Sequence, residues 1–301
     1  MKKFAMAAVA AAAMTAGVAQ AYTSGTFTNG VVVPNVIHNG ATDTTAVGVI
    51  SNGASSVFWT FFDQNSNHVT DGCFGVTNNQ FKGFTWADPT ISGAKTAGVR
   101  GYLVLAASPN GCADSAAAEA NVTAGTAATA KIAVNAFQVD VASKDVAFAP
   151  VIDGPLTVDF TKGTITTMGP DSLTAVGGAA QVAAATTATF NMRYYIDGAA
   201  GGTDTRIVVW STGNQKRSHT VDMYDNAQNR KSVNFILGNA ELDWFDPETI
   251  VGRPATFTDG FIEWNATAAS FAPATAASVY TYSVMVAPAF GAVQTVLGAH
   301  R

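Results

Sequence analysis

Oxygen-bearing side chains in the first third of the chain have the spacing of a calcium site. Asp63, Asn65 and Asn67 stand at alternate positions, and Asp71 follows shortly after them. Short carboxylate and amide side chains in this pattern can converge on one cation, and Ca²⁺ prefers such oxygen ligands. These four residues are our candidate metal ligands. Calcium is the possible cofactor, and no other cofactor is expected.

The same segment lacks two parts of a complete EF-hand loop. His68 stands where a Gly would make the sharp turn, and Phe74 stands where a bidentate Glu should be. Asn, Asp and Ser are also the residues of a plain hairpin loop, because they tolerate unusual backbone angles and bond their own main chain. A related segment, residues 225–229, has Ala227 in place of one ligand. The hairpin loop is the favoured interpretation, with calcium binding as the alternative.

A second acidic cluster lies in residues 241–248, where four carboxylates flank Trp244 and Phe245: Glu241, Asp243, Asp246 and Glu248. Two carboxylates beside an aromatic platform are what a glycosidase uses. Such an enzyme would place Asp243, Asp246 or Glu248 in a cleft with a perturbed pKa. A solvated turn at the Asp-Pro step is the favoured interpretation, and a loop that binds a sugar or a cation is another alternative.

Other catalytic motifs are absent from the sequence. It contains neither G-x-S-x-G nor H-E-x-x-H, and its four histidines show no metal-ligand spacing. We therefore predict no catalytic residues and a protein that is not an enzyme.

Four tryptophans lie in segments with strand character. Gly-Phe elements precede Trp86 and Trp264, one in each half of the chain, while Trp59 and Trp210 stand within β-rich runs. An exposed indole could stack on a sugar ring, but large aromatics also supply much of the core of a β-sandwich. We expect all four tryptophans to be core residues.

Short segments recur in the same order in the two halves of the chain. Six segments of the first half resemble six segments of the second half. In the first half they are residues 36–41, 42–44, 47–53, 61–67, 83–86 and 102–105. The corresponding segments are residues 195–199, 203–205, 207–213, 223–229, 260–264 and 282–285. Self-similarity in a fixed order indicates a duplicated structural unit.

Strand signals dominate the chain. Runs of β-branched and aromatic residues bounded by Gly, Asn, Asp or Pro predict strands. They cover residues 31–37, 46–51, 57–62, 99–106, 132–139, 145–152, 189–196, 206–211, 219–224, 232–237, 261–264, 279–286 and 293–297. The Ala-rich residues 115–130 are expected to form a loop or a short helix rather than a core element.

The predicted fold class is all-β, with two similar, duplicated antiparallel β-sandwich units of the Ig-like or Greek-key type after a cleaved signal peptide. The first unit spans residues 22–165 and includes the Ala-rich loop, and the second spans residues 166–301. One larger sandwich to which each half contributes a sheet is the alternative.

Residues 1–21 have the three parts of a bacterial signal peptide. Lys2 and Lys3 form a basic start, residues 4–18 are apolar, and Ala19-Gln20-Ala21 is a cleavage site, so the mature chain should begin at Tyr22. No later run has the ~20 apolar residues of a membrane-spanning helix. The expected location is the periplasm, the cell surface or the extracellular medium.

Cysteine content and charge agree with export. Cys73 and Cys112 are the two cysteines, and an even number in an oxidising compartment favours a disulfide. Charged residues make up only 12% of the chain, and the net charge is −5. An acidic chain without a Lys/Arg cluster argues against nucleic acid as a partner.

Together these features predict an exported noncatalytic protein with a structural or adhesive role at the bacterial cell surface or in the envelope. A secreted module that binds calcium or carbohydrate is the alternative, and a secreted glycoside hydrolase is the second alternative. The expected partners are other copies of the chain or a surface glycan.

Overall fold

The computed structural model describes residues 25–39, 43–91, 96–141, 144–199, 202–273 and 275–301. The predicted all-β class is confirmed, because antiparallel strands dominate these residues and α2 (Ser115–Thr123) is their one α-helix. None of the helices in these residues combines the length and hydrophobicity that a membrane span requires. The predicted signal peptide, residues 1–21, lies outside the described residues.

The first half of the chain forms two facing antiparallel sheets. Their strands are β1 (Gly30–Val36), β2 (Asp43–Asn52), β3 (Ser56–Asp63), β4 (His68–Gly75), β5 (Phe81–Thr85), β6 (Gly101–Ser108), β7 (Lys131–Asp140), β8 (Asp145–Ala149) and β9 (Ile152–Asp153). The strand orders are β4-β3-β6-β1-β9 and β5-β2-β7-β8. Because side chains alternate along a strand, Val47 and Val49 of β2 enter the core between the sheets with Val31 and Val33 of β1.

The second half also forms two facing antiparallel sheets. Their strands are β12 (Ala180–Val182), β13 (Ala188–Tyr195), β14 (Asp204–Ser211), β15 (Arg217–Asp225), β16 (Arg230–Leu237), β17 (Leu242–Phe245), β18 (Asp259–Ala266), β19 (Ala277–Ala287), β20 (Ala292–Leu297) and β21 (Ala299–His300). One sheet has the order β16-β15-β18-β13-β21, and the other has the order β12-β19-β14-β17 with β20 paired to β19. Ile207 and Val209 of β14 lie in the core between these sheets with Phe190 and Met192 of β13.

Apart from β12, which has no counterpart strand in the first half, the strand order is the same in both halves when β1 is matched with β13, β2 with β14, and so on to β9 with β21. A local contact fixes the register of this match. The Thr45 hydroxyl accepts a hydrogen bond from the backbone N–H of Ile37 and donates to its carbonyl, as the Thr205 hydroxyl does with Tyr195. Thr45 therefore corresponds to Thr205, and Ile50, five residues on, corresponds to Trp210.

The segment between the halves carries the two-stranded sheet of β10 (Leu156–Val158) and β11 (Leu173–Val176). The expected boundary between residues 165 and 166 lies between these two strands. Short 3₁₀ helices occur at η2 (Gly125–Ala127), η3 (Phe160–Lys162), η4 (Pro247–Thr249), η5 (Ala268–Ser270) and η6 (Pro288–Phe290).

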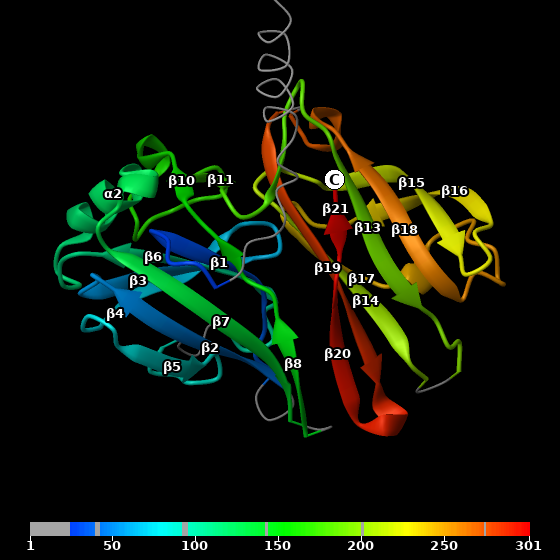
Figure 1. Cartoon of the computed structure of the whole chain (residues 1–301), viewed down its shortest axis with the longest axis horizontal. Helices are drawn as coiled ribbons and strands as arrows, with labels where there is room; N and C mark the ends of the chain where they lie inside the picture. The colour runs from blue at the N-terminus through cyan, green and yellow to red at the C-terminus, as the bar shows by residue number, and fades with distance from the viewer. Residues whose placement is uncertain (1–24, 40–42, 92–95, 142–143, 200–201, 274) are drawn as a thin grey trace, which may run out of the picture.

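A third core, which we call the junction core, joins the two halves. It forms where the outer face of the sheet β4-β3-β6-β1-β9 meets the outer face of the sheet containing β19, β14 and β17, and α2, β10 and β11 close one side of it (Figure 1). Its large members include Phe58, Phe62, Tyr102, Trp210, Leu242, Tyr280 and Tyr282. The four sheets thus enclose three cores in succession, and the halves share buried surface.

The predicted cysteine pair lies at disulfide distance. The sulfur atoms of Cys73 and Cys112 are 2.07 Å apart, and 39 positions separate the two residues in the sequence. The bond ties β4 to the loop that precedes α2. A closed loop of this length stabilises a fold by about 3–4 kcal/mol, if chain entropy is the main contribution.

Each predicted strand segment overlaps an observed strand, but several strands were missed. The omissions include β4, β5 and β17. Glycines interrupt the first two, and the third was interpreted as part of an acidic loop. The Ala-rich segment begins with α2, whose Ala118 and Val122 lie in the junction core, so it contributes more to packing than expected.

Candidate functional site

The predicted calcium ligands Asp63, Asn65 and Asn67 lie in the turn between β3 and β4. Asp63 Oδ1 accepts hydrogen bonds from the backbone N–H groups of Asn65 and Asn67, at 2.8 and 2.9 Å. Its Oδ2 accepts one from the side-chain amide of Asn67 at 2.9 Å. The carboxylate therefore organises its own turn, with Ser66 at a φ of 63°.

The corresponding turn of the second half, between β15 and β16, repeats these bonds. Asp225 accepts from the N–H groups of Ala227 and Asn229 and from the Asn229 amide, at 2.8 to 2.9 Å. Gln228 has the same φ of 63°. Because Ala227 has no ligand atom on its side chain and the turn still forms, this geometry supports the hairpin interpretation. Calcium binding stays a prediction.

Asp71, the fourth candidate ligand, is a strand residue. It lies on β4 opposite Thr60 of β3. Its Oδ1 is 3.3 Å from Nε2 of His68, with both side chains partly exposed.

The turn after β3 also attaches the first half to the second. The carbonyl oxygen of Gln64 accepts hydrogen bonds from the N–H groups of Glu241 and Leu242, both at 3.1 Å. Asn65 Oδ1 accepts a further bond from the N–H of Ala240 at 3.2 Å. The amide oxygen of a candidate calcium ligand is thus used in the contact between the halves.

Replacing Asp63 with alanine should lower the free energy of unfolding by about 1–2 kcal/mol, because the turn loses three hydrogen bonds. Asp225→Ala is the matched control, since it removes the same bonds from a turn without the contacts at Gln64 and Asn65. We expect the Asp63 variant to be the less stable of the two in urea unfolding. Equal losses would contradict a role of the turn in the junction. A rise in Tm with calcium that Asp63→Ala abolishes would instead establish the metal site.

The four carboxylates of residues 241–248 do not converge on one point. Glu241 is buried in the junction, where its Oε2 accepts a hydrogen bond of 2.7 Å from the Tyr102 hydroxyl. Burial raises the pKa of Glu241 to about 8. Asp243 is also buried, and its Oδ2 accepts bonds from the N–H groups of Gly238 and Asn239 at 2.6 and 3.0 Å. Burial raises the pKa of Asp243 as well. Both carboxylates are thus engaged in structural bonds.

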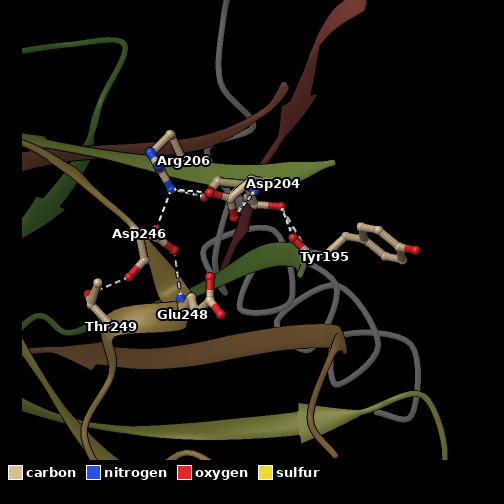
Figure 2. Close-up of polar contacts among 7 residues, drawn as sticks. Tyr195, Asp204, Arg206, Asp246, Glu248 and Thr249 are labelled. Atoms are coloured by element: carbon tan, nitrogen blue, oxygen red, sulfur yellow. Dashed lines mark hydrogen bonds and ion pairs between the residues drawn. The ribbon is translucent and has the colours of Figure 1, made fainter. Parts of the chain in front are cut away.

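The remaining two carboxylates belong to a charged group around Arg206. Arg206 Nη1 lies 2.5 Å from Asp204 Oδ2 and 2.6 Å from Asp246 Oδ2. Figure 2 shows the guanidinium between these two carboxylates, with Glu248 beside Asp246. Asp246 also accepts a bond of 2.8 Å from the N–H of Glu248, which begins the turn of η4.

This charged group borders a cleft of about 690 Å³ between the two halves. Its lining includes Asp43 and Arg100 from the first half and Asp204, Arg206, Trp244 and Glu248 from the second. Arg100 lies over the ring of Trp244, with its Cζ 4.3 Å from the ring centroid, and it donates a hydrogen bond of 2.6 Å to Asn35. Charges of both signs and one partly exposed indole therefore face the cleft.

The arrangement is better suited to a polar neutral ligand than to a metal ion. Ligand oxygens of Asp204, Asp246 and Glu248 lie within 4.8 Å of one another, which a cation could use. Arg206 already pairs with two of these carboxylates and would compete with the cation. Arg100 covers one face of the Trp244 ring, so a hydroxyl-rich molecule would meet the exposed part of the indole together with the surrounding hydrogen-bonding groups.

Sequence reasoning found only part of this cleft. Trp244 and Glu248 belong to the acidic cluster, but Asp43, Arg100 and Arg206 were missed because no spacing connects residues so distant in the chain. The expectation for Trp59, Trp86, Trp210 and Trp264 is confirmed, because their exposed fractions are 5% or less.

No protein-family model matches the chain, and no curated protein matches it in sequence. The function must therefore be inferred from the geometry.

Proposed function

We propose that this chain is an exported noncatalytic protein with a structural or adhesive role in the envelope or at the surface of a bacterium. In this proposal it consists of two duplicated Ig-like β-sandwich units that act as one stiff body. Calcium is not required for its fold.

Duplication is supported by three agreements between the halves. Their sheets have the same strand order. Thr45 and Thr205 make the same pair of backbone hydrogen bonds. Asp63 and Asp225 organise their turns with the same three donors. Unrelated sandwiches have no reason to share such local bonds at matching points of the fold.

The junction core is the observation that carries the structural role. Residues from both halves share it, and the turn at Gln64 and Asn65 adds backbone bonds across the contact. Two units packed through a large apolar contact do not move freely relative to each other. The carboxylates at Glu241 and Asp243 are engaged in structural bonds, which favours a stiff spacer over a hydrolase.

Export is tested by expressing the full chain in a bacterial host beside a variant that lacks residues 1–21. We expect the full chain to be recovered outside the cytoplasm, to begin at Tyr22 by mass spectrometry, and to carry the Cys73–Cys112 disulfide. The shortened variant should stay in the cytoplasm with reduced cysteines. A full chain that stays uncleaved in the cytoplasm would overturn the proposed function.

Binding of a neutral sugar is the second candidate function, and the Trp244 cleft is the observation that favours it. A bound sugar would raise the unfolding temperature of the wild type. A rise that Trp244→Ala abolishes would favour this candidate over a purely structural role.

A further inference from the structure

The outer face of the sheet β5-β2-β7-β8 is apolar and open to solvent. Four of its large side chains are unusually exposed: Phe81 (64%), Phe137 (40%), Val146 (53%) and Phe148 (37%). The register places Ile50 between Phe81 and Ala133, Phe137 between Ala46 and Phe148, and Val139 beside Val146, all on this face. Exposed apolar surface gathered in this way marks an interaction site more often than scattered residues do.

The face is uneven as well as apolar. Phe81 lies over the paired glycines of the neighbouring row, since an added Cβ at Gly48 would stand 2.7 Å from its ring and one at Gly83 would stand 3.3 Å from it. A groove of about 470 Å³ lies over these glycines and is bordered by Phe81, Phe137 and Thr85. The face therefore offers an aromatic ridge next to a hollow into which a second ridge could fit.

In the second half, the face that corresponds to this one is covered by another sheet. It is the face of β14, β17 and β19 that carries Val208, Trp210 and Tyr282, and another sheet covers that face in the junction core. In the register fixed by Thr45 and Thr205, Gly48 and Ile50 are the counterparts of Val208 and Trp210. The same architectural face is thus buried in one half and open in the other.

Of the outer sheet faces that the structure describes, the open face itself is the apolar one that a second copy could place against it. The outer face of β4-β3-β6-β1-β9 is already buried in the junction core. The outer face of β16-β15-β18-β13-β21 is polar, with bonds such as Thr220 to Asn234 and Asp222 to Arg230. Ala46, Gly48, Ile50, Phe81, Gly83, Thr85, Ala133, Asn135, Phe137, Val139, Val146 and Phe148 of the open face are all uncharged. Lys131 shares this alternation but lies at the end of β7 opposite Asn52, so pairing the central rows of this face with themselves brings no like charges together.

We infer that two copies of the chain associate through this face, sheet against sheet and related by a two-fold axis. The inference rests on the proposed structural role, for which it names the partner. The four strands have 10, 5, 10 and 5 residues. With a mean length of about seven residues at about 3.4 Å each, and about 4.8 Å between strands, they cover roughly 450 Å² per copy. The dimer would bury roughly 900 Å² in total, which lies at the low end for specific interfaces. The dimer is therefore weak and depends on concentration.

Sedimentation velocity of residues 22–301 from about 1 µM to about 1 mM tests the inference, a range chosen because small interfaces bind weakly. We expect the mass to rise from one chain toward two. Phe137→Glu should weaken the dimer at least tenfold, because Phe137 lies between Ala46 and Phe148 on this face and each copy would bury a new carboxylate in the apolar contact. Ile236→Glu is the matched control on the outer polar sheet at the opposite end of the molecule, where Ile236 is 68% exposed, and should leave the association unchanged (Figure 1).

A second variant protects the test against misfolding. Thr85→Lys changes a side chain that is already exposed on the same face and should also weaken the dimer. A single-chain mass across the whole range, or a dimer indifferent to both Phe137→Glu and Thr85→Lys, would overturn the inference. A monomer that is nonetheless exported and cleaved would leave the proposed function intact, whereas an uncleaved cytoplasmic chain would refute that function whatever its mass.

Discussion

Replacing Trp210 with alanine should lower the free energy of unfolding by about 3–5 kcal/mol, which is the usual cost of deleting a fully buried large aromatic side chain. Trp210 is completely buried in the junction core, and its ring centroid lies 5.8 Å from that of Tyr102 across the contact between the halves. Its loss leaves a cavity that neither sheet can close without shifting its partner. Urea unfolding of residues 22–301, followed by circular dichroism, measures the effect.

Ile50→Ala is the matched control for this prediction. Ile50 is the counterpart of Trp210 in the first half, but it lies partly exposed on the open sheet face. Because it borders solvent rather than a second sheet, we expect it to cost about 1 kcal/mol or less. Similar losses in the two variants would contradict the junction core as the feature that joins the halves.

The junction also predicts how the tryptophan variant unfolds. With an intact shared core, the halves should unfold in one transition. Once Trp210 is removed, the weakened contact should let the halves unfold at separate urea concentrations, so that probes of the two halves no longer coincide. A variant that keeps a single transition at the wild-type midpoint would show that the halves do not depend on this contact.

Local features of the fold could be predicted from the sequence because they depend on neighbouring residues. The turn around Asp63 is an example, since its three donors lie within four residues of the carboxylate. The pattern of alternate oxygens left calcium and a hairpin open, because both use the same side chains. The bonds repeated at Asp225 support the hairpin, and calcium binding stays a prediction.

The duplication stays a proposal, and the segment matches that predicted it from the sequence agree only in part with the strand order. Residues 47–53 and 207–213 fall on matching strands, β2 and β14. Residues 83–86 include the end of β5 and were compared with residues 260–264 of β18. The strand order instead makes β17 the counterpart of β5. A Gly followed by aromatics recurs in several strands, and only hydrogen bonding between distant strands decides which of them correspond.

Two further features depended on contacts between distant parts of the chain. The cleft brings Asp43 and Arg100 to Arg206 and Glu248, which no spacing in the sequence connects. Glu241 looked like a member of a solvated acidic loop, and β17 was missed for the same reason. Glu241 is buried because the first half packs against it, with the Tyr102 hydroxyl bonded to its carboxyl group. The composition of the neighbouring residues does not predict that contact.

The stability of the chain should fall as the pH rises from about 4.5 to about 8, and Glu241→Gln should remove much of this dependence. Glu241 is 5% exposed, and burial raises its pKa from 4.5 to about 8. In this range the folded chain holds a proton that the unfolded chain has released, so unfolding becomes more favourable as the pH increases. The full effect is at most about 5 kcal/mol, because each pKa unit corresponds to about 1.4 kcal/mol.

The Glu241→Gln substitution removes the ionisable group and keeps a side chain of nearly the same shape. Its amide oxygen can still accept the hydrogen bond from the Tyr102 hydroxyl, which in turn lies 2.6 Å from the Ser66 hydroxyl, but it cannot ionise. We therefore expect wild type and Glu241→Gln to be similarly stable near pH 4.5 and the variant to be the more stable above pH 8 in urea unfolding. Glu248→Gln, an exposed carboxylate of the cleft, is the control and should keep the wild-type slope. An unchanged slope in Glu241→Gln would mean that the junction opens to solvate the carboxylate, and the two halves would then be less firmly joined than their shared core implies.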